Sequence, residues 1–438
     1  MKILIANYRY FISSGPERYL FNISEKLEAE GHTVMPFSIQ YAKNVPSAYS
    51  RYFVSPIGGP EAVYFDQHRR DLRSVYKGLS RTFYSREVEQ AARRMVDETQ
   101  PDIAYVLYYL RKLSPSLLVG LKRAELPIVV RISDYGMFCP EHHLLRGDSP
   151  CTLCQKGSIL NSVRHKCVKG SRTVSAIDAA ATLFHRWRGY FDLIDQFVTT
   201  NEFMSKMMVE AGFAANRITC IPTFTDLEAF SPAPSRRDRD YLLYVGRLDK
   251  PKGVHVLISA MLSLAGRLQP LPQLRIAGTG HGAEYVDGLK RQVAEAGLAD
   301  RIVFEGNVEG SRIPDLMRGA IACIMPAIWF ENLPNSVVES LACGCPVIAS
   351  DIGSLSYTVT HGVDGLLFRA GDAADLAGKI EEIVKDPALR DRLGEGARKT
   401  AAARHNPTDH VAKLTKLFTE LAARKSRIRG IERGVSVA

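Results

Sequence analysis

The chain has 438 residues, of which 46% are hydrophobic and 24% are charged. This balance is that of an ordinary globular protein, and it excludes a disordered, collagen-like or multi-span membrane chain. At about 100–200 residues per domain, the length predicts two domains. The 57 basic residues outnumber the 47 acidic ones, giving a formal charge of +10. Such a charge indicates anionic partners without distinguishing phosphates, nucleic acid and lipid headgroups.

The amino-terminal residues predict a buried strand rather than a secretory signal. The apolar run at 2–6 is short and stops at Asn7-Tyr8-Arg9-Tyr10. No apolar run approaches the ~18 residues that a membrane-crossing helix needs. We therefore expect a cytosolic protein whose eight cysteines are thiols or metal ligands rather than disulfides.

Short apolar runs alternate with amphipathic stretches through the first half of the chain. A helix is expected at 17–30, and strands are expected at 2–6, 33–37, 103–107, 127–131 and 197–200. This alternation predicts βαβ units around a parallel sheet.

A Pro-rich, charged segment at 231–240 predicts a linker, after which a second alternating series begins. Helices are expected at 255–267 and 282–296, and strands at 241–245, 273–277, 301–304, 322–325 and 346–349. The predicted fold class is therefore α/β, with two facing Rossmann-like domains at 1–230 and 241–405 and a ligand site in the cleft between their parallel sheets. The remainder, 406–438, is a basic tail with a helix at about 410–426, and periodicity does not say which domain this helix covers.

Two carboxylates surround a helix expected at 335–343. Pro334 suits the first turn, and the helix would offer free N–H groups and its positive dipole end to a diphosphate. Glu331 precedes the helix and Glu339 lies about a turn inside it, so both can face one cleft, where carboxylates suit sugar or ribose hydroxyls. The alternative is a solvated Glu331 and a Glu339 that complements the helix dipole.

Two cations lie in the loop that follows the strand at 241–245. Arg247 and Lys252 straddle a tight turn in Gly246-Arg247-Leu248-Asp249-Lys250-Pro251-Lys252-Gly253. A guanidinium fork and an ammonium together suit a diphosphate leaving group. The alternative is a solvated basic turn.

Other loops give weaker signals. Gly15 turns the chain between the first strand and the first helix, and Gly280 lies in a glycine loop that could approach a nucleotide. That loop departs from the dinucleotide fingerprint because Gly282 comes one residue too early. Asp238 and Asp240 resemble a metal-binding Asp-x-Asp pair, but their position in the charged linker favours solvation.

In combination and order, these motifs resemble the family 4 retaining glycosyltransferases of the GT-B fold, from residue 2 to about 416. The similar segments are Gly15 with Gly31-His32-Thr33-Val34, Ile221-Pro222 with Asp226 and Phe230-Ser231-Pro232, Gly246-Arg247-Leu248 with Lys252-Gly253, the Glu-x7-Glu pair Glu331 and Glu339, 342–350 and 362–368.

The resemblance implies transfer of a sugar from a UDP- or GDP-sugar with retention of anomeric configuration and without a catalytic metal. Arg247 and Lys252 would bind the diphosphate and stabilise the charge that develops on it. Glu331 would bind the transferred sugar, and Glu339 would bind the ribose of the nucleotide. The backbone amide of Leu333 would donate a hydrogen bond to the β-phosphate, and Val308 would contact the base. The implied donor-binding set is Gly15, Arg247, Lys252, Gly280, Val308, Glu331, Leu333 and Glu339.

The chain departs from the family pattern at two places. Ser133 stands where many members have a histidine that contacts the donor sugar, whereas the following Asp134 is retained. Asp134 could orient the acceptor hydroxyl or accept its proton, or it could cap the next turn. The segment 353–357 lacks the second glycine and the acidic residue common there, which leaves the donor preference open.

A cysteine-containing insertion is expected at about 139–170. Cys139, Cys151, Cys154 and Cys167 could hold a structural zinc ion, with His142, His143 and His165 as substitute ligands. The alternative is four free thiols. The other cysteines, Cys220, Cys323, Cys343 and Cys345, are expected to be small core residues.

The basic excess is concentrated around this insertion, since residues 111–190 hold 13 basic and 5 acidic residues. Within it, 183–191 mixes aromatic rings and cations. This stretch could rest on an anionic membrane or receive a lipid-diphosphate acceptor. The alternative is a helix that packs its aromatic side chains inward.

The sequence thus predicts a glycosyltransferase that extends a glycan or a lipid-linked acceptor in cell-surface polysaccharide biosynthesis, at the inner face of the cell membrane. One alternative is a nucleotide-sugar epimerase or phosphorylase of the same fold. Another is a zinc-containing nucleic-acid-binding protein. The chain offers no recognised nucleic-acid motif for the latter, so no nucleic-acid partner is expected.

Overall fold

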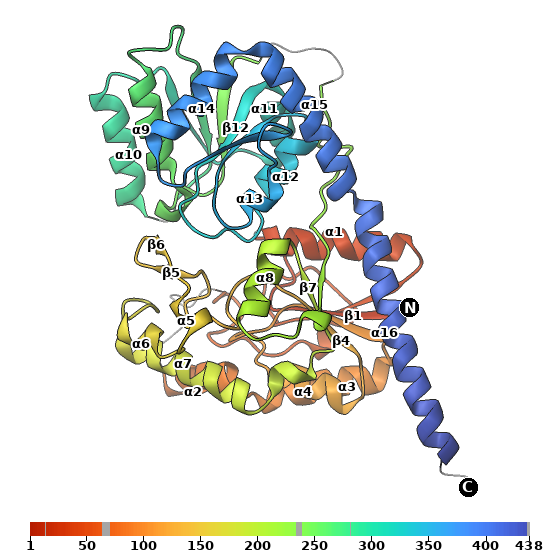
Figure 1. The fold of residues 1–438 in the computed structure, drawn as a ribbon. Coiled ribbons are helices and arrows are strands. Elements are labelled where there is room, and N and C mark those ends of the chain that lie inside the picture. Colours follow the sequence, from red (N-terminus) through yellow and green to blue (C-terminus); the bar gives the residue numbers. More distant parts are fainter. Residues whose placement is uncertain (14, 64–70, 234–238, 281, 436–438) are drawn as a thin grey trace.

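The computed structural model describes the chain except residues 14, 64–70, 234–238, 281 and 436–438. It contains two α/β domains, one above the other in Figure 1, and a long helix that runs from the upper domain down the side of the lower one. Half of the predicted linker, including Asp238, lies outside the described residues.

The amino-terminal domain is built on a six-stranded parallel sheet in the order β2-β1-β3-β4-β7-β8. The central strands are mostly apolar and buried because helices cover both faces of the sheet. Their bounds are β1 (Lys2–Asn7), β2 (Thr33–Phe37), β3 (Ile103–Tyr108), β4 (Ile128–Arg131), β7 (Gln196–Thr199) and β8 (Ile218–Cys220). Its helices are α1 (Gly15–Ala29), α2 (Leu72–Phe83), α3 (Arg86–Thr99), α4 (Ser116–Arg123), α5 (Leu153–Lys156), α6 (Asn161–Arg164), α7 (Arg172–Trp187) and α8 (Glu202–Glu210), with the hairpin β5 (Leu145–Arg146) and β6 (Ser149–Pro150).

The carboxyl-terminal domain repeats this plan with the strand order β11-β10-β9-β12-β13-β14. Its first strand, β9, pairs with both β10 and β12, so the strand order reverses there. The strands are β9 (Tyr241–Val245), β10 (Gln273–Ala277), β11 (Ile302–Gly306), β12 (Ala320–Met325), β13 (Val347–Ser350) and β14 (Gly365–Phe368). The helices are α9 (Val254–Leu264), α10 (Ala283–Glu295), α11 (Ile313–Gly319), α12 (Asn335–Ala342), α13 (Leu355–Thr358), α14 (Ala373–Lys385) and α15 (Pro387–Arg404). Each strand predicted from the sequence is present within two residues of its predicted ends, whereas β8 and β14 were not predicted.

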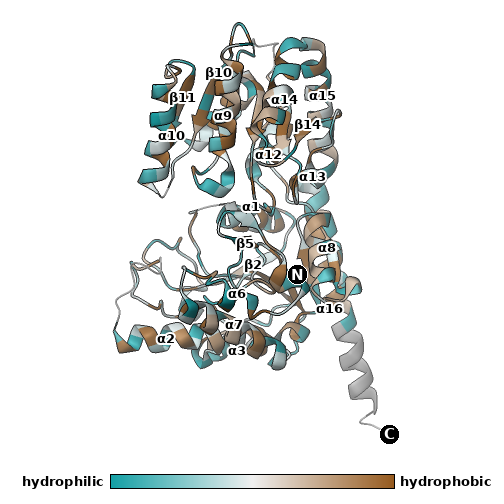
Figure 2. Cartoon of the chain, turned by 60° about the vertical axis from the view of Figure 1, so that its left-hand side comes forward, coloured by the Kyte–Doolittle hydropathy of each residue, from teal (hydrophilic) through white to brown (hydrophobic). Residues whose placement is uncertain are grey.

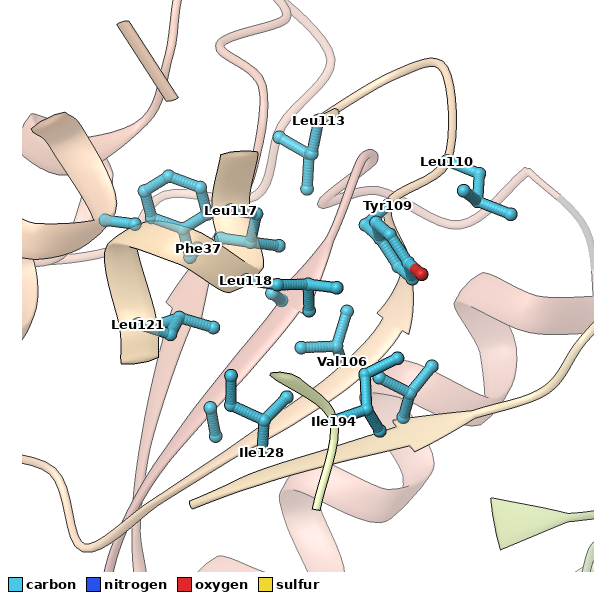
Figure 3. Close-up of a cluster of buried hydrophobic side chains, with 14 of the residues drawn as sticks. Phe37, Val106, Tyr109, Leu110, Leu113, Leu117, Leu118, Leu121, Ile128 and Ile194 are labelled. Carbon is cyan, nitrogen blue, oxygen red and sulfur yellow. The ribbon is translucent and has the colours of Figure 1, made fainter. Parts of the chain in front are cut away.

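Figure 3 shows how helical spacing builds the core of the amino-terminal domain. Leu117, Leu118 and Leu121 project from one face of α4 towards Val106 of β3 and Ile128 of β4, and all five are at most 2% exposed. Burying a leucine of this kind contributes about 1.5–3 kcal/mol. The sheet is therefore held rigid where its carboxyl ends carry polar loops.

The last helix, α16 (Pro407–Val435), covers the amino-terminal domain rather than the domain from which it emerges. Its buried residues Val411, Leu414 and Phe418 recur at helical spacing and pack against side chains of β1 and β3. The ring of Phe418 lies 5.3 Å from that of Tyr105. None of the helices that the structure describes combines the length and the apolar character needed to cross a bilayer.

Two buried histidines, one before α16 and one in its first turn, fasten this part of the chain to the segment that leaves the amino-terminal domain. Nδ1 of His405 donates to the carbonyl of Thr223 (2.7 Å), and Nδ1 of His410 donates to the carbonyl of Pro222 (2.7 Å). Burial lowers the pKa of each imidazole to about 4. The hydrogen bonds to the carbonyls raise the pKa, but they offset only part of the effect of burial. Both histidines are therefore neutral in the folded protein.

We predict that acidification from pH 6.5 to about 4 weakens the fold through these two histidines. Their pKa values rise to ordinary ones near 6.5 on unfolding, so the unfolded chain binds protons that the native chain does not. The stabilisation, roughly 3 kcal/mol for each histidine, is complete above pH 6.5 and is lost as the pH falls towards 4. Urea unfolding at a series of pH values measures this loss. Between pH 6.5 and 4, the free energy of unfolding should fall less for the double variant His405→Gln/His410→Gln than for the wild type. Equal losses would contradict this account.

Candidate functional site

The cleft between the domains holds a cavity of about 490 Å³ at the carboxyl ends of both sheets. The sequence analysis placed the ligand site there. The amino-terminal domain contributes Tyr8, Gly15, Pro16, Glu17, Tyr19, Tyr108, Arg131, Ser133, Asp134, Tyr135, His142, His143, Thr200 and Thr223 to the lining. The carboxyl-terminal domain contributes Tyr244, Val245, Gly246, Arg247, Lys252, Met325, Trp329, Phe330, Glu331, Asn332, Leu333, Pro334, Asn335 and Ser336.

The predicted site residues fall into three groups in space. Six of them line the cavity together: Gly15, Asp134, Arg247, Lys252, Glu331 and Leu333. Glu339 lines a smaller adjoining cavity of about 60 Å³, to which Gly15 and Asn335 also contribute. Gly280 and Val308 line neither of these two cavities. Val308 packs against the apolar cluster around Tyr241 and Met317, and a Cβ on Gly280 would lie 2.5 Å from the carbonyl oxygen of Leu248.

A buried ion pair forms the centre of the cleft. Nζ of Lys252 lies 2.6 Å from Oε1 of Glu331, and the two side chains are 15% and 7% exposed. Nε1 of Trp329 donates to the same carboxylate oxygen (2.7 Å), so two donors converge on one acceptor. Charges removed from water in this way need such partners, because each loses the free energy of its hydration.

Local backbone geometry brings Lys252 to this position. Lys250–Lys252 form a 3-10 turn that ends at Gly253 with φ +75°, a conformation that side chains disfavour. A Cβ on Gly253 would lie 1.7 Å from the carbonyl oxygen of Pro326. Glycine thus lets the basic loop lie directly against the loop that follows β12 and carries Glu331.

Arg247 supplies a second, more exposed cation to the same wall. Its guanidinium pairs with Asp249 (3.0 Å), and its carbonyl accepts a hydrogen bond from the Tyr244 hydroxyl (2.6 Å). The amino end of α12 also reaches the cavity through Leu333, Pro334, Asn335 and Ser336, and no side chain caps this end. An uncapped helix amino end and two cations provide what an anion such as a diphosphate requires.

Glu339 is paired across the domain boundary with a residue that the sequence analysis did not identify. Nη1 of Arg18, on α1, lies 3.1 Å from Oε1 of Glu339. Burial raises the pKa of the Glu339 carboxyl, and the neighbouring Arg18 partly offsets this effect. The carboxylate predicted for a ribose is thus already bound by the opposite domain.

Asn332 joins the two domains beside Glu331. Its Nδ2 donates to the carbonyl of Ser133 (2.9 Å), and its Oδ1 accepts from the Thr200 hydroxyl (2.8 Å). The Tyr135 hydroxyl donates to the carbonyl of Glu331 (3.2 Å). No motif predicted these bonds, because their partners lie 132 to 199 residues apart in the sequence.

Asp134 contacts a histidine that arrives from the insertion. Oδ2 of Asp134 lies 3.1 Å from Nδ1 of His142, and Oδ1 accepts the backbone N–H of Gly136 (2.8 Å). Burial alone would raise the pKa of this carboxyl, but His142 and the Gly136 N–H outweigh it and lower the pKa. A Cβ on Gly136 would lie 2.5 Å from Nδ1 of His142. The insertion therefore places an imidazole beside the aspartate, next to Ser133.

The zinc site expected at the four cysteines of the insertion stays a prediction. Across the described residues, which include all four of these cysteines, no group of three or more His, Cys, Asp or Glu side chains is arranged to hold a metal ion. Cys139 packs in the main core of its domain, whereas Cys154 packs in a separate small cluster with Ile159 and Ala179. Burial raises the pKa of these two thiols to about 12 and about 11. None of the four thiols is in a disulfide, as both zinc ligands and free thiols require.

The fold has clear counterparts among solved structures. Sucrose-phosphate synthase from Thermosynechococcus elongatus matches with a TM-score of 0.69 at 21% identity, over 97% of this chain and 99% of that one. HepE from Anabaena, solved in complex with UDP, matches with a TM-score of 0.67 at 18% identity, over 96% of this chain and 100% of that one. Two facing parallel-sheet domains with the site between them define the GT-B class of α/β proteins.

Sequence comparison finds relatives for the carboxyl-terminal half of the chain. Residues 227–400 match the family model described as glycosyl transferases group 1. A curated D-inositol 3-phosphate glycosyltransferase from Nocardiopsis dassonvillei is 32% identical over 239 residues, which cover 50% of this chain and 54% of that protein. One from Thermobispora bispora is 30% identical over 54% of this chain and 58% of that protein. The chain thus spans about half the length of these relatives, and its carboxyl-terminal half is similar to the group 1 glycosyl transferases.

We predict that the Lys252–Glu331 pair behaves as a unit in stability measurements. Lys252→Met or Glu331→Gln alone leaves a buried group without its partner, and each should lower the free energy of unfolding by about 3–5 kcal/mol. The double variant removes both charges and should lose about 1 kcal/mol or less. Urea unfolding of the four proteins gives the coupling free energy. Single-variant losses that simply add in the double variant would contradict a coupled pair.

Proposed function

We propose that the protein transfers a sugar, with retention of anomeric configuration, from a UDP- or GDP-sugar to a glycan or lipid-linked acceptor in cell-surface polysaccharide biosynthesis. The observation that carries this proposal is the buried Lys252–Glu331 pair beside the uncapped end of α12. A cation and a carboxylate placed together in a cleft suit a ligand that is both a diphosphate and a sugar. The relative HepE, whose structures contain UDP and UDP-glucose, supports the nucleotide-sugar donor.

The donor would lie across the carboxyl-terminal wall of the cleft. Arg247, Lys252 and the amino end of α12 would bind its diphosphate through charge-assisted hydrogen bonds. A diphosphate that attracts Lys252 frees one oxygen of Glu331 to accept a hydrogen bond from the transferred sugar. Glu339 would bind the ribose, for which it must first lose its contact with Arg18.

The reaction would proceed by departure of the diphosphate and attack of the acceptor hydroxyl on the same face of the sugar. The bond from the anomeric carbon to the phosphate oxygen breaks, and Arg247 and Lys252 stabilise the charge left on the diphosphate. We infer that Asp134, ionised and held by His142, orients the acceptor hydroxyl from the opposite domain. The acceptor proton ends on the departing phosphate. No catalytic metal is required in this scheme.

The acceptor would be bound by the amino-terminal domain at the inner face of the cell membrane. The 13 basic residues among 111–190 suit an acceptor that carries a phosphate or diphosphate. The curated relatives are named for a phosphorylated acceptor, D-inositol 3-phosphate, which is likewise anionic. An epimerase or phosphorylase of this fold needs no such acceptor. The two kinds of activity are therefore separated by incubating the protein with a nucleotide sugar in the absence of acceptor and identifying the products. Formation of an epimerised nucleotide sugar would reject the transferase function.

Donor binding can be tested without knowledge of the acceptor. We expect UDP or GDP, and the corresponding sugar nucleotides, to raise the unfolding temperature of the protein. A ligand that binds only the native state stabilises that state by mass action, and the gain is about 2.7 kcal/mol when the ligand concentration is a hundred times Kd. Arg247→Ala should weaken binding about tenfold, since a hydrogen bond to a charged group contributes about 1.5–3 kcal/mol. Arg291→Ala, at an exposed position on α10, serves as the matched control. No thermal shift with any nucleotide, or equal shifts for both variants, would reject this donor site.

The contact between Arg18 and Glu339 yields a prediction in the opposite direction. Because Arg18 competes with the ribose for Glu339, Arg18→Met should tighten UDP binding, by up to about fivefold for a partly exposed ion pair worth about 1 kcal/mol. Glu339→Ala should weaken UDP binding, and Lys26→Ala on the same helix should leave it unchanged. Isothermal titration measures all three affinities. Weaker UDP binding by Arg18→Met would instead make Arg18 a direct ligand of the nucleotide.

A further inference from the structure

Helix α2 presents an apolar face to solvent. Leu72, Val75, Tyr76 and Leu79 recur at helical spacing, and Leu72 and Tyr76 are 90% and 76% exposed. Residues at these spacings share one face of a helix, which in a globular protein normally packs against a core. In the part of the chain that the structure describes, this face is exposed. Figure 2 shows α2 at the edge of the amino-terminal domain, with brown apolar segments along it. Such an extended apolar stripe marks an interaction site.

Helix α7 lies beside α2 and adds to this surface (Figures 1 and 2). Its inner face is packed, since the ring of Phe184 lies 5.9 Å from that of Phe83 on α2, and His185 contacts the carbonyl of Thr82 (3.0 Å). Its outer face carries Leu183 and Trp187, the latter 79% exposed. The two interpretations of 183–191 thus apply to opposite faces of one helix.

Basic residues outnumber acidic ones in the segments that carry these apolar side chains. Within 71–83 and 161–192 the sequence contains nine basic and three acidic residues. Of the acidic residues, Asp71 caps the amino end of α2, and Asp178 is buried and pairs with Arg111 (3.3 Å). Seven of the nine basic side chains are exposed: Arg73, Arg164, Lys166, Lys169, Arg172, Arg186 and Arg188. The surface therefore combines apolar side chains with an excess of positive charge.

This combination favours a lipid bilayer over the other anionic partners. Nucleic acid would require cations but would gain little from exposed leucine and valine side chains. A helix that lies in a membrane interface has an apolar face, an aromatic residue at headgroup level and flanking arginine and lysine side chains. Each Lys or Arg near an anionic leaflet adds attraction that salt screens.

We propose that α2 and α7 together form the surface by which this protein docks on an anionic membrane, with Tyr76 and Trp187 inserted at headgroup level. This inference rests on the membrane location in the proposed function and names the surface responsible for it. Docking would also hold the acceptor side of the cleft at the bilayer. Asp178 of α7 pairs with Arg111, and Arg111 contacts His142, which lies beside Asp134.

The test is cosedimentation of the full chain with vesicles of phosphatidylcholine containing 30% phosphatidylglycerol, against pure phosphatidylcholine vesicles. We expect binding to the anionic vesicles that weakens at high salt. The partition coefficient should fall about tenfold or more in Tyr76→Ser/Trp187→Ser and in Arg186→Gln/Arg188→Gln, since each pair supplies part of the apolar or the electrostatic attraction. Val363→Ser and Arg392→Gln/Lys399→Gln, exposed changes on the carboxyl-terminal domain, are the matched controls and should bind as the wild type does.

The thermal shift with UDP is measured on every variant, which separates loss of docking from loss of folding or of donor binding. Absence of wild-type binding to anionic vesicles would overturn the docking surface and the membrane location, while a retained UDP shift would leave the donor proposal intact. Wild-type binding that neither double variant weakens would overturn the surface alone. Tight, salt-sensitive binding of an oligonucleotide without vesicle binding would assign the surface to nucleic acid.

Discussion

The chemistry of the cleft depends on one buried ion pair. Lys252 and Glu331 come from two loops at the carboxyl ends of neighbouring strands, β9 and β12, and meet at 2.6 Å. Each would be costly to bury alone, because water solvates an isolated charge far better than the protein interior does. Together with the Trp329 N–H, they form a polar centre that could bind two parts of one ligand. A sugar hydroxyl could bind the carboxylate, and a diphosphate could bind the ammonium.

The loop that carries Glu331 also carries the contacts that join the domains. The carbonyl of Glu331 accepts from Tyr135, and the next residue, Asn332, bonds to both Ser133 and Thr200. A change in the position of Glu331 therefore alters the contact between donor and acceptor walls. Arg18 and Glu339 add an ionic contact across the same boundary. If the proposed donor binds at Glu331, its binding and the arrangement of the domains are coupled through residues adjacent in sequence.

Sequence reasoning found the parts of this site that local patterns encode. The strands that end at Val245 and Met325 were predicted because buried parallel strands are continuous apolar runs. Arg247, Lys252 and Glu331 became candidates because they follow these two strands. The short strands β8 and β14 give too few residues for a pattern. Arg18 could not be found this way, because its partner Glu339 lies 321 residues away in the sequence. His142 was named only as a substitute zinc ligand, because its contact with Asp134 is set by the fold of an irregular loop. The cysteine spacing predicts zinc, and this stays a prediction, because the apolar packing of Cys139 and Cys154 alone does not distinguish ligands from free thiols.

The most direct test of this account is a crystal structure of the protein with a bound, non-hydrolysable UDP- or GDP-sugar. The account predicts a diphosphate against Arg247, Lys252 and the amino end of α12, and a sugar hydroxyl on Glu331. The distance from Lys252 to Glu331 should then exceed the 2.6 Å of the free protein. A nucleotide bound elsewhere, or one that leaves this ion pair intact and contacts neither partner, would contradict the central claim.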